Sequence, residues 1–111
     1  MQKVIVFFLI IIGFSSCRKD EYKKLDCSTI NAKYNADIKP IINANCTSSG
    51  CHDAGSGNGD YTTYSGLKIK VDNSSLSSRV LYDKNMPPNG ALSLDDRNKI
   101  KCWLDNGAPN N

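Results

Sequence analysis

The residues best suited to chemistry lie in one short stretch, residues 45–54, NCTSSGCHDA. Cys46 and Cys51 enclose four residues, and His52 follows the second cysteine directly. Two thiols and an imidazole in this order permit covalent attachment of a haem, coordination of a metal ion, or a disulfide beside an uninvolved histidine. A haem attachment motif ordinarily has two residues between its cysteines, so the spacing alone leaves all three open.

The scarcity of other ligands adds weight to this stretch. His52 is the only histidine of the 111 residues, and Met86 is the only methionine apart from Met1. Met86 is followed by Pro87 and Pro88, and it lies outside any apolar periodicity. Because proline fixes the backbone φ angle, the methionine sits in a stiff loop. A single methionine is more often core filler, but here it accompanies a single histidine that follows a cysteine.

Three pieces of this sequence resemble small class I c-type cytochromes of bacteria: IKPIINANCTSSGCH, the NMPP loop and the terminal KIKCWLDNGAPNN. Together they frame residues 35–111. The resemblance implies that thioethers join Cys46 and Cys51 to one covalent haem c. It also implies that His52 is the proximal iron ligand and Met86 the distal one. The two extra residues between the cysteines are then expected to form a local bulge.

The implied function is single-electron transfer by a monohaem c-type cytochrome that is not an enzyme. Two strong-field axial ligands leave iron no open position, which favours electron transfer over oxygen activation. The expected partners are a redox donor and a redox acceptor, which dock weakly and transiently. The chain has 14 basic and 11 acidic residues, an excess too weak for a nucleic-acid binder. Five lysines near the loops and the last helix are candidates for guiding an acidic partner: Lys68, Lys70, Lys84, Lys99 and Lys101.

Other interpretations remain open at the level of sequence. If Met86 dissociates, the protein is a haem-based sensor or a minor peroxidase. If Cys46 and Cys51 pair with each other, it is a haem-free, disulfide-stabilised exported lipoprotein. A structural zinc or iron–sulfur site would need Cys27 and Cys102 as further ligands, and the usual two-knuckle spacings do not occur.

The amino-terminal residues 1–16 are typical of a lipoprotein signal peptide. An apolar run, VIVFFLIIIGF, is too short for a permanent membrane span, and Ser15 and Ser16 stand directly before Cys17 as in a lipobox. We therefore expect lipidation at Cys17, with an ordinary signal peptide as the alternative. The chain then divides into a signal peptide (1–16), a lipid-anchored tether (17–27) and a cytochrome c domain (28–111). The expected location is the periplasmic face of a membrane, or the cell surface, of a Gram-negative bacterium.

The candidate ligands must be positioned by helices and long loops. Apolar spacing predicts helices over residues 36–45, 61–69 and 74–83, and a last helix between a Ser93 cap and Gly107. Asn35 or Asp37 is the expected cap of the first helix. Strand signals are poor, and LKIKVD is the only candidate. The predicted fold class is mostly α, a cytochrome c-like small helical domain with long loops around one covalent haem.

A domain this small needs a covalent staple or a cofactor to complete its core. Since the first and last helices cross in class I cytochromes, the resemblance implies a disulfide between Cys27 and Cys102. It also implies that the haem packs against a set of apolar side chains: Ile38, Ile42, Leu67, Val80, Leu81, Trp103 and Leu104.

Overall fold

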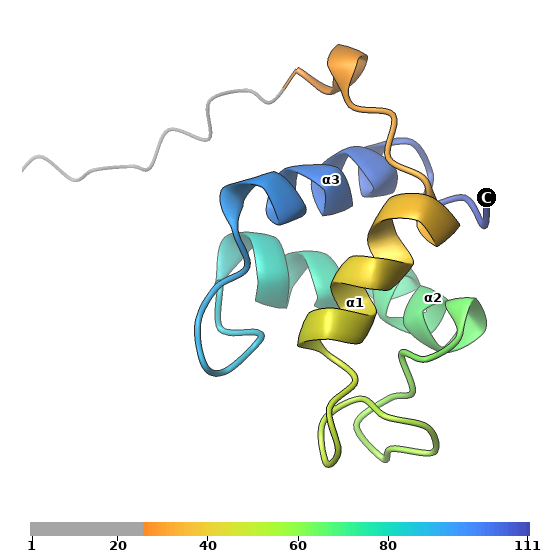
Figure 1. Ribbon diagram of the computed structural model, residues 1–111, viewed down its shortest axis with the longest axis vertical. Coiled ribbons are helices and arrows are strands. Elements are labelled where there is room, and N and C mark those ends of the chain that lie inside the picture. Colours follow the sequence, from red (N-terminus) through yellow and green to blue (C-terminus); the bar gives the residue numbers. More distant parts are fainter. Residues whose placement is uncertain (1–25) are drawn as a thin grey trace, which may run out of the picture.

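Helices and loops make up all of the chain that the computed structural model describes, residues 26–111 (Figure 1). In chain order the elements are η1 (Cys27–Thr29), η2 (Tyr34–Ile38), α1 (Lys39–Asn45), α2 (Tyr64–Asp72), η3 (Ser77–Tyr82) and α3 (Leu94–Asp105). No strand occurs between residues 26 and 111, so the prediction of a mostly helical domain is confirmed. The strand candidate LKIKVD is helical and forms most of α2.

Three of the sequence predictions fall outside the described part of the chain. The signal peptide, the lipidated Cys17 and the tether as far as residue 25 precede the first described residue. Within residues 26–111, no helix has the length and apolar character needed to cross a membrane.

The first helical segment, η2 followed by α1, begins with unusually wide turns. The amide of Ile38 donates to the carbonyl of Lys33, five residues back, at 3.1 Å. In a regular α-helix the ring of Pro40 would clash with a carbonyl four residues earlier, and wider turns relieve that clash. The carboxylate of Asp37 accepts a 2.8 Å hydrogen bond from the Lys33 amide. The N-cap residue is Lys33, so the prediction of Asn35 or Asp37 at that position is wrong, and Asp37 satisfies the Lys33 amide from inside the first turn.

The core forms where η2, α1, α2 and η3 pack beneath α3. The largest fully buried side chains are Ile38, Ile42, Leu67, Ile100 and Trp103. Tyr34 lies between two aromatic neighbours, with ring centroids 6.0 Å from Trp103 and 5.0 Å from Tyr64. Because α3 packs directly on η2 and η3, the first and last helical segments meet.

Local sequence signals account for both ends of α3. Ser93 Oγ accepts a 3.1 Å hydrogen bond from the Asp96 amide at the start, as predicted. At the end, Gly107 has a φ of 89°, and the Ala108 amide donates to the Trp103 carbonyl at 2.9 Å. This is the Schellman arrangement, which requires the left-handed conformation that glycine adopts without strain.

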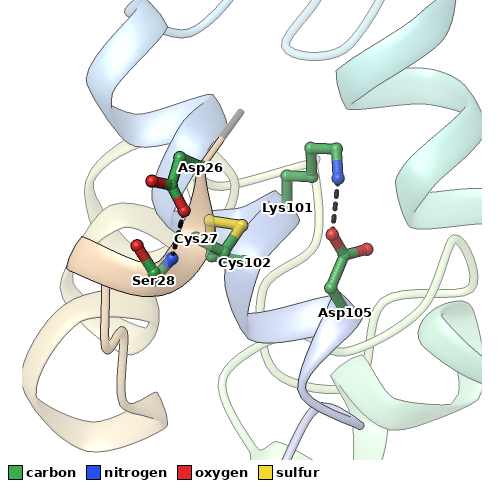
Figure 2. Close-up of a disulfide and its surroundings, with 6 residues drawn as sticks. All are labelled: Asp26, Cys27, Ser28, Lys101, Cys102 and Asp105. Atoms are coloured by element: carbon green, nitrogen blue, oxygen red, sulfur yellow. Dashed lines mark hydrogen bonds and ion pairs between the residues drawn. A yellow bond between two sulfur atoms is a disulfide. The ribbon is translucent and has the colours of Figure 1, made fainter. Parts of the chain in front are cut away.

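A disulfide joins Cys27 to Cys102, as expected (Figure 2). The two residues are 75 positions apart, and their Cα atoms are 5.4 Å apart. On either side of the bridge, Asp26 caps η1 by accepting from the Ser28 amide, and an ion pair links Lys101 to Asp105 along α3. A cross-link across so long a segment stabilises the fold by about 4 kcal/mol through the entropy that it removes from the unfolded chain.

Candidate functional site

A cavity of about 420 Å³ brings together the four residues that the sequence singled out, Cys46, Cys51, His52 and Met86. The first three follow the end of α1, and Met86 comes from the loop before α3. In Figure 1 the loop that follows α1 lies at the bottom of the view and the loop that precedes α3 lies at its lower left, whereas the orange η1 lies at the top. The volume lies within the range of roughly 300–1,000 Å³ that small-molecule sites occupy.

The rest of the cavity lining combines apolar side chains, two cations and the uncharged residues Asn45, Gly50, Asn58 and Ser75. Its apolar part consists of Tyr61, Leu76, Val80, Pro87 and Pro88, and its cations are Lys70 and Arg79. No Asp side chain lines the cavity. Of the apolar residues expected to contact a haem, Val80 lines the cavity, whereas the fully buried ones pack against one another in the core. The sequence pattern alone did not distinguish residues that line the cavity from residues that fill the core, because both are apolar.

Residues 48–51, within the segment from Cys46 to Cys51, form a closed turn. The Cys51 amide donates to the Ser48 carbonyl at 2.9 Å, and Gly50, the third residue of this turn, has a φ of 82°. These features are those of a type II β-turn, whose third position favours glycine. The His52 amide then donates to the Cys46 carbonyl at 3.0 Å. The extra residues are thus absorbed locally, and both cysteines and the histidine still face one cavity.

Both cysteines of the cavity are free thiols. The pairing of Cys46 with Cys51 is therefore not the arrangement in this structure. Burial raises the pKa of the Cys46 thiol to about 11, with a smaller contribution from the nearby Cys51. The Cys46 thiol therefore stays protonated well above neutral pH.

The structure also contradicts a four-cysteine metal site. That site would need Cys27 and Cys102, and these two residues are bonded to each other. Within residues 26–111 there is no group of three or more His, Cys and Asp side chains that could hold a metal ion.

The ring of His52 is held by its neighbours on one edge and one face. Its Nδ1 lies 3.2 Å from the carbonyl oxygen of Gly59. Because a carbonyl only accepts, this hydrogen bond requires the proton on Nδ1, which leaves the Nε2 lone pair available for a metal. Ligating histidines are commonly oriented by such a bond from the second ring nitrogen.

Tyr61 stacks on the His52 ring. The two rings are parallel within 1°, with centroids 3.9 Å apart, and the Tyr61 amide donates to the His52 carbonyl at 3.0 Å. Burial raises the pKa of the Tyr61 hydroxyl, with a smaller contribution from Cys46. The sequence suggested Tyr61 only as a helix residue. No spacing rule identifies it as a partner of His52, since their contact depends on how the loop from 53 to 60 closes.

Two glycines allow this loop to close. Gly59, whose carbonyl holds His52, has a φ of 109°, a conformation that other residues rarely adopt. Gly66 in α2 lies directly under the loop, and a Cβ there would be 1.8 Å from the carbonyl oxygen of Asp60. Any side chain at position 66 would push the loop away from α2.

Met86 is fixed by a backbone carbonyl within η3. The amides of Asn85 and Met86 both donate to the Arg79 carbonyl, at 3.0 and 3.3 Å, and the Met86–Pro87 peptide is cis. The Met86 side chain is half-buried and packs against the core. Its thioether is thereby held in the cavity that His52 also lines.

The candidate docking lysines differ in their surroundings. Lys68, Lys99 and Lys101 each form an ion pair with an aspartate on the same helix. An ion pair partly cancels the charge that would attract an acidic partner, so these three are weak candidates. Lys70 instead lines the cavity.

Comparisons of the chain with models of protein families, with curated proteins and with solved structures give no match. The residues of the cavity and their geometry therefore support the functional proposal on their own.

Proposed function

We propose that this protein is a monohaem c-type cytochrome that carries single electrons, with a cytochrome c-like fold. One observation carries the proposal: two free cysteines, the only histidine and the only methionine of the described chain line the same cavity. These four side chains come from loops that lie 34 positions apart at their closest, so local sequence alone does not bring them together.

The residues present fit a haem. Cys46 and Cys51 would hold it through thioethers, and each is a free thiol that can add to a vinyl group. His52 would bind the iron through Nε2, because Nδ1 is engaged by Gly59. Met86 would supply a second iron ligand through its thioether sulfur. The apolar lining suits a macrocycle, and covalent attachment explains how a small domain retains it. When bound, the haem supplies one-electron exchange between ferric and ferrous iron.

The protein's own residues prepare the site for rapid electron exchange. Tyr61 covers one face of the His52 ring and the Gly59 carbonyl fixes its orientation. The Arg79 carbonyl fixes the Met86 segment from the other loop. Two ligands held in this way would favour electron transfer with little rearrangement, and if both bound the iron they would disfavour oxygen chemistry. We therefore propose a carrier rather than an enzyme.

The decisive experiment is to express the full-length chain together with a c-type cytochrome maturation system. We expect a coloured protein whose haem survives acid-acetone extraction, since thioethers resist it. The double variant Cys46→Ala/Cys51→Ala should lose that resistance, whereas the control variant Lys68→Gln, which lies outside the cavity, should keep it. A colourless wild-type protein obtained under these conditions refutes the proposal. Rapid binding of carbon monoxide by the reduced protein would instead favour a sensor or a minor peroxidase.

We also propose that the chain is exported and anchored through a lipid on Cys17, from which it exchanges electrons with weakly docked donor and acceptor proteins. The lipobox-like residues before Cys17 support the anchor. Cys17→Ala should shift the protein from the membrane fraction to the soluble fraction. Retention of the variant in the membrane fraction, with the same distribution as wild type, would argue against a lipid at this residue.

A further inference from the structure

The charged side chains that line the cavity are all positive. Lys70 and Arg79 line it, and no carboxylate side chain does. The cavity is otherwise apolar or uncharged, so its two cations are poised to attract anionic groups on a ligand that fills it. A haem carries two propionate carboxylates, which matches two cations in number and in sign.

Lys70 lies beside the segment that holds His52. Its side chain passes so close to Gly59 that an added Cβ there would be 3.0 Å from Lys70 Cε and 3.9 Å from Nζ. Gly59 thus leaves room for the lysine and also supplies the carbonyl that binds His52 Nδ1. Unlike Lys68 two positions earlier in α2, which pairs with Asp72, Lys70 has no ion pair within the described chain.

Arg79 lies beside the segment that holds Met86. Its backbone carbonyl accepts hydrogen bonds from the Asn85 and Met86 amides, while its exposed side chain lines the cavity. Its guanidinium likewise has no ion pair within residues 26–111. A guanidinium binds a carboxylate through two parallel hydrogen bonds, an arrangement that lysine does not provide.

We propose that Lys70 and Arg79 form the propionate-binding site of this protein, each cation contacting one propionate of the haem. The inference rests on the proposed function and goes beyond it, because it assigns the two residues that orient the macrocycle in the cavity. The cations also raise the reduction potential, since nearby positive charge disfavours ferric iron relative to ferrous iron.

The test uses the full-length protein with its haem attached and measures the reduction potential of charge variants. Lys70→Gln and Arg79→Gln should each lower the equilibrium constant for reduction, by between about twofold and about tenfold. A tenfold change corresponds to about 59 mV for a one-electron couple. Charge reversal by Lys70→Glu should roughly double the shift of Lys70→Gln, whereas Arg79→Lys should restore most of the wild-type potential. If the two side chains acted only through packing, the shift in reduction potential would not scale with the change in charge.

Lys68→Gln is the matched control, because it removes the same charge from the same helix outside the cavity. A second measurement follows the infrared carboxylate bands of haem labelled with carbon-13 at its propionates. These bands should shift in Lys70→Gln and Arg79→Gln and stay in place in Lys68→Gln. If haem is attached but the potentials and bands of all three variants coincide, the propionate site is refuted while the cytochrome function stands. If the wild type carries no haem, both fail.

Discussion

Replacement of Gly66 by alanine gives the sharpest test of how the loop is held against α2. Helix propensity alone predicts that Gly66→Ala stabilises the protein, by up to about 1 kcal/mol. The structure predicts the opposite sign, because the new Cβ would stand 1.8 Å from the Asp60 carbonyl oxygen and 3.1 Å from Thr63 Oγ1. The Asp60 oxygen belongs to the backbone, so the loop itself must move.

The size of the effect follows from that displacement. Real Cβ atoms essentially never lie within 3.0 Å of such an atom, so the loop must shift by more than an ångström. Overpacking of this kind costs about 1–3 kcal/mol, which exceeds the gain in helix propensity. After subtraction of the propensity gain, we expect a net loss of about 1 kcal/mol in the free energy of unfolding. For a domain of this size that corresponds to a fall in Tm of roughly 4–8 °C.

Urea unfolding, followed by the fluorescence of the buried Trp103, measures this change. Gly57→Ala is the matched control, since a Cβ at Gly57 meets nothing within 4 Å. It should change the free energy of unfolding by no more than about 0.5 kcal/mol. The same loop carries Gly59 and Tyr61, so Gly66→Ala should also perturb the absorption spectrum of the haem-loaded protein. A Gly66→Ala protein as stable as the Gly57→Ala protein would refute the reasoning.

Three further predictions follow from the disulfide, the buried thiol and the methionine. Cys27→Ser/Cys102→Ser should lower the free energy of unfolding by about 4 kcal/mol in urea titrations, and dithiothreitol should destabilise the wild type but not this variant. The folded-state pKa of Cys46 is raised from 9.0 to about 11, so its contribution to stability is complete below pH 9 and is lost as pH rises towards 11. The stability of the haem-free protein should therefore fall over that window more steeply than that of Cys46→Ala, and parallel curves would contradict the burial of this thiol. Met86→Ala should abolish the weak iron–sulfur absorption band of the ferric protein and lower the reduction potential, and an unchanged spectrum would exclude Met86 as a ligand.

The helices were predictable to the extent that their signals are local. Ser93 and Gly107 delimit α3 because a cap hydrogen bond and a left-handed residue act within one turn. The alternation in LKIKVD was a weaker signal, and the segment is helical because Leu67 faces the core from α2 while Ile69 on the other face stays exposed. The wide turns before Pro40 follow from the clash of its ring with the carbonyl four residues earlier. Sequence rules interpret a proline at such a position only as a sign that a helix begins there.

The candidate site was likewise predictable only in part. The scarcity of histidine and methionine singled out His52 and Met86 as candidate ligands, since chemistry restricts which side chains can bind iron. The sequence did not reveal that Tyr61 stacks on His52, that the Gly59 carbonyl fixes its tautomer, or that Lys70 and Arg79 line the same cavity. These contacts join residues through loop closure, which depends on close approaches such as that of Asp60 to Gly66.

By itself, the sequence determined the helical class, the caps of the last helix and the small set of side chains able to hold a cofactor, because these depend on residue type and short-range spacing. Tertiary structure alone decided that Cys46, Cys51, His52 and Met86 share one cavity and that Ile38, Leu67 and Trp103 fill the core instead. The physical reason is that the packing of α3 across η2 and η3 determines which side chains are buried and which meet in the cavity. That packing is a property of the whole chain.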